Sequence, residues 1–501
     1  MDLLANLALG FDTALTLSNL LYCFIGVLIG TLIGVLPGIG PVATIAMLLP
    51  ITFTLAPVSA MIMLAGIYYG AQYGGSTSAI LINLPGEITS VATVLDGHAM
   101  AKQGRAGVAL ATAAIGSFVA GTIATFLLAA FAPPLAELAL KFGPHEYFAL
   151  MVLGLVASIV LAHGSLLRAV GMILLGLLLG LIGADVNSGV QRFTFGIPEL
   201  ADGVGFVVAA MGMFGLGEIA RNLENEATRT RLVGRITTLM PTREDFRRMV
   251  GPILRGTFIG SALGILPGNG AVLGSFTSYS VEKKLSKTPE QFGKGMIEGV
   301  AAPESANNAG AQTSFIPMLT LGIPSTPVMA LMIGALIIQG IQPGPTVVTN
   351  QPALFWGIIV SMWIGNVFLL ILNLPLIGIW VRLIMVPYHL LYPAILVFCA
   401  IGVYSLNSST LDVHLMALFG VLGYVFAKLE CEPAPMLLGF LLGPMMEEYL
   451  RRAMIISRGD ATTFLTRPLS ATMLAMAVIA MVIVLLPAIR KTRAVAFQEE
   501  D

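Results

Sequence analysis

The chain has 501 residues, of which 56% are hydrophobic and 11% charged, and its mean hydropathy is +0.90. Roughly a quarter of the residues of a soluble domain are charged, so this composition excludes an ordinary water-soluble protein. It predicts instead an all-α polytopic membrane protein that contacts the lipid bilayer. The net charge is −1, which gives no reason to expect a nucleic acid partner.

Uncharged stretches predict membrane helices along most of the chain. They are close to the roughly 20 residues that a helix needs to span a bilayer, and we expect about 10–12 spans. The clearest stretches are residues 118–135, 147–161, 169–183, 204–216 and 352–381. The first 30 residues hold no Lys or Arg, so the basic region of a signal peptide is missing and we expect the first span to be retained.

The first apolar stretch is interrupted at residues 34–41, which read GVLPGIGP. Pro37, Gly38 and Gly40 break the helix, and broken backbone is tolerated in hydrocarbon only where it is buried in protein or lines a cavity. The freed N–H and C=O groups of such a break can bind anions and small cations. The alternative is a helix kink or a turn outside the membrane, so one break alone does not establish a site.

Small polar side chains follow in GGSTSAILINLPGE at residues 74–87. Ser76, Thr77 and Ser78 can hydrogen-bond a carboxylate or coordinate Na⁺, although Ser and Thr in membrane helices also bond their own backbone. Pro85 predicts a further break. We expect the connector at residues 87–107 to lie at the surface, with its charged side chains in solvent. These side chains are Glu87, Asp96, His98, Lys102 and Arg105.

A polar segment with eight arginines between residues 221 and 255 divides the chain. It contains no apolar run long enough to span a bilayer, and the positive-inside rule predicts a cytoplasmic loop. We therefore divide the chain into a first membrane repeat (residues 1–220), a cytoplasmic polar linker (221–250), a second membrane repeat (251–467) and a C-terminal span with its tail (468–501).

The second half repeats the first break. Residues 30–40, GTLIGVLPGIG, match residues 260–270, GSALGILPGNG, at six of eleven positions. Glycine is abundant in this chain, so four of these matches carry little weight, but the ordered L-P-G-x-G is hard to obtain by chance. The second copy contains Pro267, Gly268, Asn269 and Gly270.

The polar stretch is also repeated, because GGSTSAILINLPGE at residues 74–87 resembles GAQTSFIPMLTLGIPST at residues 310–326. The matched pairs are Gly74 and Gly310, Thr77 and Thr313, Ser78 and Ser314, and Pro85 and Pro324. Two repeated segments in the same order indicate a duplicated chain.

Charges around the two breaks predict that the two halves are inverted. Arginines and lysines flank the second break between residues 247 and 287, whereas residues 2–59 around the first break hold none. The second break would then open to the cytoplasm and the first to the outside. The arms of the second break, residues 252–266 and 271–281, are about 22 and 16 Å long as helices, too short for a bilayer core of about 30 Å. We therefore expect re-entrant hairpins in two inverted repeats, as in many secondary transporters.

The candidate site combines the breaks with the polar side chains. Asn307 and Asn308 are adjacent amides, which are poor lipid-facing residues, and Glu304 beside them can bind a cation or a proton or cap a helix. The residues predicted to bind substrate are Gly38, Gly40, Ser76, Thr77, Ser78, Gly268, Asn269, Gly270, Asn307, Asn308, Thr313 and Ser314. The prolines predicted to break helices are Pro37, Pro85, Pro267 and Pro324, and Na⁺ is expected near Gly38, Thr77, Asn308 and Ser325.

A carrier has two alternatives. A passive anion channel with two re-entrant loops remains the alternative, although the lack of a ring of charged residues disfavours it. An intramembrane enzyme would need a nucleophile with an acid or base partner, and the sequence contains no HExxH, GxSxG or Walker A motif. We therefore expect no catalytic residues and no cofactor.

Several motifs together are similar to those of a known family. They are LPGIGP at residues 36–41, YYGAQYGGSTSAILINLPGE at 68–87, LPGNG at 266–270 and a stretch at 299–345 that contains PESANNA. The chain resembles in these motifs the large membrane subunit of the bacterial tripartite tricarboxylate transporters. The resemblance implies a secondary active transporter of the cell inner membrane that imports citrate or a related carboxylate with Na⁺ by elevator-type motion. It also implies a small membrane subunit and a periplasmic solute-binding protein as partners.

Overall fold

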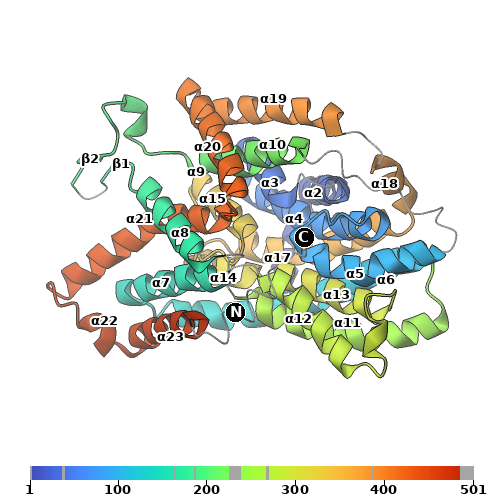
Figure 1. The fold of residues 1–501 in the computed structure, drawn as a ribbon. Helices are drawn as coiled ribbons and strands as arrows, with labels where there is room; N and C mark the ends of the chain where they lie inside the picture. Colours follow the sequence, from blue (N-terminus) through green and yellow to red (C-terminus); the bar gives the residue numbers. More distant parts are fainter. Residues whose placement is uncertain are drawn as a thin grey trace.

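The computed structural model describes residues 3–36, 40–161, 165–185, 188–224, 239–266, 270–384 and 388–485, and these residues form mostly helices (Figure 1). The main helices before residue 225 are α1 (Leu3–Ala14), α2 (Leu17–Val35), α3 (Gly40–Thr52), α4 (Pro57–Ile82), α5 (Val91–Met100), α6 (Ala106–Ala139), α7 (Pro144–Leu161), α8 (Leu166–Gly180), α9 (Phe206–Ala210) and α10 (Gly217–Glu224). Those after residue 238 are α11 (Arg243–Gly264), α12 (Gly270–Leu285), α13 (Glu298–Thr313), α14 (Phe315–Leu321), α15 (Pro327–Ile338), α16 (Thr346–Asn350), α17 (Pro352–Asn373), α18 (Ile377–Leu383), α19 (Tyr388–Asn407), α20 (Thr410–Lys428), α21 (Pro433–Ile456), α22 (Thr463–Thr466) and α23 (Pro468–Leu485).

Two short strands, β1 (Gly183–Ala184) and β2 (Gln191–Arg192), form an antiparallel pair between α8 and α9. Asp185 and Arg192 next to this pair bond to α21, where Arg451 donates to Asp185 at 2.7 Å and Glu447 accepts from Arg192 at 3.0 Å. These ion pairs hold the hairpin against α21.

Four helical segments in the described residues are long and apolar enough to cross a membrane. They are residues 17–35, 88–139, 352–373 and 410–428. Several shorter apolar helices of 10–17 residues accompany them, so the number of 10–12 spans stays a prediction. The apolar stretch at 352–381 does not form one helix, because α17 ends at Asn373 and α18 begins at Ile377.

Glycines allow α2 and α4 to pack with their backbones in contact. The facing residues are Gly26, Gly30 and Gly34 on α2 and Gly66, Gly70 and Gly74 on α4. A Cβ atom built on Gly26, Gly30 or Gly34 would lie 2.3–2.4 Å from a carbonyl oxygen of α4. Any side chain at these positions would therefore push the two helices apart.

The pair formed by α11 and α13 in the second half is built in the same way. The facing residues are Gly256, Gly260 and Gly264 on α11 and Ala302, Ala306 and Gly310 on α13. A Cβ atom on the three α11 glycines would lie 2.1–2.4 Å from a carbonyl oxygen of α13. Gly260 and Gly264 are the sequence matches of Gly30 and Gly34, so the close helix pairing is repeated together with the sequence.

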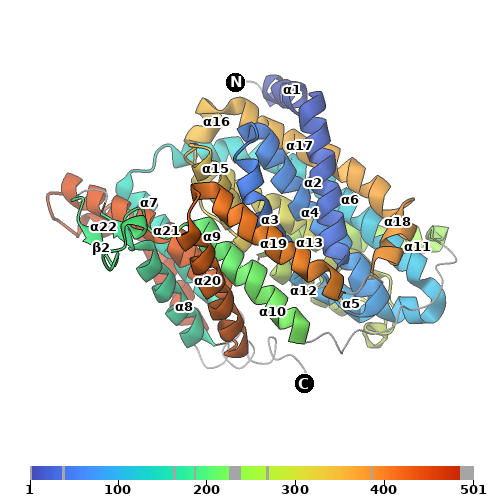
Figure 2. The same ribbon diagram turned by 90° about the horizontal axis from the view of Figure 1, so that it is seen from above.

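The two halves also exchange packing partners. Helix α6 of the first half packs on α13 of the second half, and α17 of the second half packs on α4 of the first. Likewise α3 packs on α15, and α12 packs on α5 and on the 3₁₀ turn Ile88–Ser90. Figures 1 and 2 show α2, α4, α5, α6 and α11 on one side of the molecule and α7, α8, α21 and α22 on the other. This correspondence agrees with a duplicated chain, and the inversion of the halves stays a prediction.

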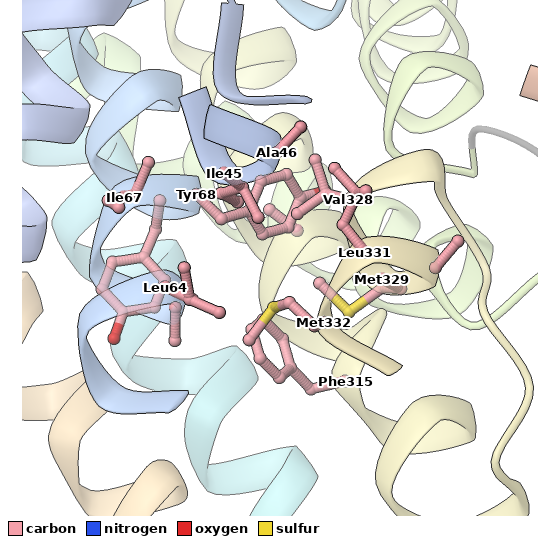
Figure 3. Packing of buried hydrophobic residues seen from close by; sticks show 14 of the residues in the cluster. Ile45, Ala46, Leu64, Ile67, Tyr68, Phe315, Val328, Met329, Leu331 and Met332 are labelled. Carbon is pink, nitrogen blue, oxygen red and sulfur yellow. The ribbon is translucent and has the colours of Figure 1, made fainter. Parts of the chain in front are cut away.

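An apolar core joins the halves between α3 and α4 on one side and α14 and α15 on the other (Figure 3). The ring of Tyr68 on α4 packs against that of Phe315 on α14, with 6.3 Å between the ring centroids. Met329 and Met332 of α15 lie beside them in the same cluster. Because the side chains of this core come from both halves, neither half buries its apolar surface alone.

The arm length predicted for α11 was wrong. The helix begins at Arg243, inside the predicted linker, because Thr242 and Asp245 form a capping box in which each side chain accepts a hydrogen bond from the backbone N–H of the other. Its 22 residues are about 33 Å long, but the charged first turns, REDFRR, keep α11 out of the set of described helices that are apolar enough to cross a membrane. The re-entrant hairpin at the second break therefore stays a prediction.

Candidate functional site

The two polar sequences lie on helices that are buried on every side. Residues 59–82 of α4 and 299–313 of α13 are all buried, although they contain Ser, Thr, Asn, Gln and Glu. In a membrane protein such side chains face the bundle interior, where they mark pathways for ions or substrates. The centre of α4 and α13 is therefore the candidate site.

Glu304 of α13 lies at the point where α13 meets α4 and α5. Its carboxyl group is fully buried and accepts a hydrogen bond from the Ser76 hydroxyl at 2.6 Å and another from the Thr93 hydroxyl at 2.5 Å. Ser76 was a predicted ligand, whereas Thr93 lies in the connector and was missed. The bonds join both halves of the chain through one carboxyl group.

The two predicted amides have different surroundings. Asn308 donates from Nδ2 to the Ser117 hydroxyl of α6 at 2.6 Å and to the backbone oxygen of Glu304 at 3.1 Å. Asn307 is fully buried, and among the described residues neither its Oδ1 nor its Nδ2 has a hydrogen-bond partner. Asn308 thus links α13 to α6, while Asn307 keeps its full bonding capacity.

A second buried network joins α4, α6 and α17. The Tyr73 hydroxyl donates to Oδ1 of Asn366 at 2.6 Å, and Nδ2 of Asn366 donates to the Phe118 carbonyl at 2.8 Å and to the Thr122 hydroxyl at 3.1 Å. The sequence analysis missed Tyr73 and Asn366. An amide inside the apolar stretch 352–381 was the signal that could have identified Asn366.

A small cavity of about 10 Å³ opens beside these networks. It is lined by Tyr73, Ser76, Thr77, Leu110, Ala113, Ala114, Ser117 and Asn373. This volume is about what one ordered water molecule requires, so the cavity suits a water or a small ion and not a tricarboxylate. Thr77 is the predicted Na⁺ ligand that lines it.

The predicted breaks at Pro85 and Pro324 have the same local structure. Each lies two residues after a residue in the left-handed region, Asn83 with φ 60° and Gly322 with φ 70°, which ends the preceding helix. After the second break, the Ser325 hydroxyl donates to the carbonyl of Ser314 at 3.1 Å. Ser325 is therefore held against α13 and α14 rather than at the cavity.

Other predicted ligands bond their own helices. Ser78, Thr313 and Ser314 donate to backbone oxygens three or four residues earlier in the chain. Gly40 begins α3 with φ +64°, and Gly270 begins α12 close to the carbonyl oxygen of Leu263. Pro37, Gly38, Pro267, Gly268 and Asn269 lie outside the described residues.

The connector was wrongly predicted to expose Asp96 and His98. Both are buried, with exposed fractions of 0% and 4%. Asp96 accepts hydrogen bonds from the backbone N–H groups of Gly293, Gly295 and Met296 at 2.7–3.0 Å and from the Tyr279 hydroxyl at 2.9 Å. The sequence could not reveal this, because the donors are about two hundred residues away in the chain.

The charges nearest to the predicted cytoplasmic loop form ion pairs. Arg105 donates to Asp245 at 2.6 Å, and Arg248 donates to both oxygens of Glu298 at 2.8 Å. Burial opposes the ionisation of Asp245, but hydrogen bonds from Thr242 and the Arg105 guanidinium outweigh it and lower the pKa of Asp245. Arg105 is thus a paired side chain that ties the connector to α11.

The apolar helices and the buried polar centre define a polytopic α-helical membrane protein whose two halves share hydrogen-bonded polar side chains in its interior. The sequence profile of the tripartite tricarboxylate transporter TctA family matches residues 20–438. The chain belongs to this family of transporters, as its motifs predicted.

Two proteins of Agrobacterium vitis are similar to the chain. An uncharacterized 52.8 kDa protein in the TAR-I ttuC' 3' region is 64% identical over 501 residues, which cover 100% of both chains. An uncharacterized protein in the TAR-II ttuC' 3' region is 63% identical over 242 residues, which are 48% of this chain and 100% of that protein. No solved structure matches the chain.

Proposed function

We propose that the chain is the large membrane subunit of a secondary active transporter that imports a carboxylate together with Na⁺. The carboxylate would be a tricarboxylate such as citrate, or a related dicarboxylate or aromatic carboxylate. One observation carries the proposal: hydroxyl, amide and carboxyl groups from both halves converge on α4, α6 and α13 inside a bundle of the TctA family. A polar centre shared by two halves is typical of secondary transporters, which expose it to each side in turn.

The two ligands would bind at different places. The cavity beside Thr77 has room for one small ion, which favours Na⁺ there over the carboxylate. The carboxylate would bind nearer the breaks, where the N-termini of α3 and α12 begin at Gly40 and Gly270. Helix N-termini favour anions because their first N–H groups are unpaired and the helix dipole is positive there.

The proposed cycle moves the site between the two sides of the bacterial inner membrane by an elevator-type motion. The glycine-paired helices α2 with α4 and α11 with α13 would move together, since their backbones are in contact. The helices α7, α8, α21 and α23, which pack on one another, would form the stationary part. A periplasmic solute-binding protein would deliver the carboxylate, and a small membrane subunit would complete the transporter.

The proposal is tested by uptake of radiolabelled di- and tricarboxylates into proteoliposomes that contain this chain and its two partner subunits. With an inward Na⁺ gradient, we expect saturable accumulation above equilibrium, and without the gradient we expect the accumulation to be lost. Equilibration without accumulation would contradict active transport and favour a passive anion channel. Absence of uptake for every carboxylate would contradict the substrate class.

A further inference from the structure

Two buried polar side chains near the centre have no hydrogen-bond partner, and they come from different halves of the chain. Ser90 ends the 3₁₀ turn Ile88–Ser90 of the first half, and Asn307 lies on α13 of the second half. Both are 0% exposed, and among the described residues the Ser90 hydroxyl and both polar atoms of the Asn307 amide are without a partner. A buried polar group without a partner destabilises the fold, and a bound ligand that accepts its hydrogen bond removes that cost.

The pairing of α5 with α13 places these two side chains opposite each other. Thr93 of α5 donates to Glu304 of α13 at 2.5 Å, and one turn further along α5, Asp96 accepts from a backbone N–H that precedes α13. The two helices therefore run in opposite directions. Three residues back along α5 and three residues forward along α13 lead to Ser90 and Asn307. Ser90 has helical backbone angles, φ −85° and ψ 0°, so the pairing extends to it.

The first turn of α12 lies beside the same position. A Cβ atom on Gly310 of α13 would lie 2.9 Å from Cα of Ala271 in this turn, and one turn further along α12, Ser275 donates to the Pro303 carbonyl at 2.8 Å. Asn307 lies between these two contacts on α13, and the 3₁₀ turn before α5 packs on both helices. The first N–H groups of a helix have no partner within it, and the helix dipole is positive there.

The nearest acids do not use these donors. Glu304 accepts from the hydroxyls of Ser76 and Thr93, and Glu87 accepts from Gln72 at 3.3 Å. The two unpaired side chains therefore keep their O–H and N–H hydrogens for another acceptor. Together with the N–H groups of α12 they form a set of hydrogen-bond donors that suits a carboxylate group. Na⁺ in the cavity, which Ser76 lines, would offset the negative charge of the nearby acids.

The first half lacks this arrangement at the matching position. Gly74 matches Gly310 in the repeated sequence, so the residue that matches Asn307 is Ala71, which is buried and apolar. Helix α4 thus offers no amide where α13 offers one. This difference favours α12 over α3 as the helix whose N-terminus receives the carboxylate group.

We propose that Ser90 and Asn307 bind one carboxylate group of the substrate at the N-terminus of α12. The Ser90 hydroxyl and Nδ2 of Asn307 donate hydrogen bonds to its oxygens, and N–H groups in the first turn of α12 donate further ones. This assignment rests on the carboxylate transport proposed above. It adds Ser90 to the residues predicted to bind substrate, and it makes the site a joint product of both halves.

Substitution of these groups should weaken ligand binding without weakening the fold, which separates a binding role from a structural one. We expect Ser90→Ala and Asn307→Leu to melt in detergent without substrate at the temperature of the parent or above it, because neither loses a hydrogen bond among the described residues. In nanodiscs that hold the chain with its small membrane subunit, the Kd of labelled citrate should rise about ten-fold in Ser90→Ala and at least as much in Asn307→Leu. Binding of labelled Na⁺ without citrate should stay within about two-fold of the parent in both variants.

Ser261→Ala is the matched control, because the Ser261 hydroxyl is also buried and without a partner among the described residues but lies on α11. It should change neither the melting temperature nor the binding of citrate. If the parent accumulates another carboxylate of the uptake panel instead of citrate, that compound is the probe.

Three results would overturn the assignment and leave the proposed function standing. Unchanged carboxylate binding in both variants would exclude contact with the substrate. Unchanged carboxylate binding with a lowered melting temperature would indicate a bridging water only. Loss of Na⁺ binding with intact carboxylate binding would indicate a cation site. If the parent neither binds nor takes up any carboxylate, the proposed function fails and this assignment fails with it.

Discussion

Buried hydroxyl and amide groups of this protein divide according to what they bond. Ser78, Thr313 and Ser314 donate to carbonyls of their own helices, which satisfies them locally. Ser76 and Asn308 bond side chains on other helices, so they connect elements that the proposed motion must keep together. Substitutions in the second group should affect transport more than substitutions in the first.

We expect Asn308→Leu to lower uptake at least about ten-fold, because it removes the bond to Ser117 and leaves that hydroxyl beside an apolar side chain. Radiolabelled uptake, corrected for the amount of protein in the membrane, measures the effect. Ser305→Ala on the same helix is the control, because Ser305 bonds the Ala301 carbonyl of its own helix. Normal uptake by Asn308→Leu, or an equal loss in Ser305→Ala, would show that the bond has no special role.

Asp245 predicts a pH dependence of stability. Its pKa is lower in the folded protein than in the unfolded chain, so the ionised group stabilises the fold above about pH 4, and this contribution is lost as the pH falls through the lowered pKa. Asp245→Asn removes the negative charge that pairs with Arg105 in the first turn of α11 and should lower the free energy of unfolding by about 1 kcal/mol at neutral pH, or the melting temperature by about 2 °C.

Thermal unfolding in detergent at several pH values checks this. Below about pH 4 the difference between Asp245→Asn and the parent should shrink, because the parent has also lost the ionised carboxylate. Glu244→Gln in the same turn is the control, since Glu244 is exposed and does not cap α11. A difference that is constant over all pH values would rule out the charge of Asp245 as its cause.

At the scale of helices, glycine positions determine which elements can move as one body. Two helices whose backbones touch along three turns cannot slide past each other without separating, because each glycine lies against a carbonyl of its partner. The same arrangement occurs at Gly30 and at its sequence match Gly260. The glycine matches that carried little weight as sequence evidence thus have a structural cause.

We expect Gly30→Ala and Gly260→Ala each to destabilise the protein by about 1–3 kcal/mol, because the new Cβ would lie 2.4 Å from the Ile67 oxygen and 2.1 Å from the Ala306 oxygen. The melting temperature in detergent measures this. Gly171→Ala on α8 is the control, since nothing lies within 4 Å of a Cβ there, and it should be neutral or slightly stabilising. Equal melting temperatures for all three variants would contradict close packing at the paired glycines.

At the scale of the whole molecule, the halves are interlocked rather than side by side. Helix α6 of the first half packs on α13, a member of the glycine-paired helices of the second half, and α17 of the second half packs on α4 in the same way. The apolar core between α3, α4, α14 and α15 contains side chains of both halves. Such exchange means that neither repeat is an independent domain, although the sequence divides them cleanly at the arginine-rich segment.

Inverted repeats predict that equivalent positions of the two halves face opposite sides. Thr54 follows α3 and Lys287 follows α12, and both side chains are exposed. We expect a membrane-impermeant maleimide to label Thr54→Cys in intact cells and Lys287→Cys only after the cells are opened. Both variants should be made with Cys431→Ser, because Cys431 is the native cysteine that is not buried. Labelling of both positions from the same side would contradict the inversion.

The sequence by itself determined the membrane class and the family, indicated a duplicated chain, and singled out Ser76, Glu304 and Asn308 among the polar residues of the centre. These follow from composition and from short motifs, which depend only on residues that are neighbours in the chain. The early start of α11 was also encoded locally, in the capping box at Thr242 and Asp245, and was overlooked.

Only the tertiary structure decided which polar groups bridge helices and which are satisfied locally. Thr93, Ser117 and Asn366 became part of the centre because their partners lie about two hundred residues away or more. The same is true of Asp96. Its polar sequence context predicted an exposed connector, but in the fold its carboxylate accepts hydrogen bonds from the backbone of residues 293–296. Burial and hydrogen bonding of a side chain depend on what packs against it in space, and the sequence around the residue does not contain that information.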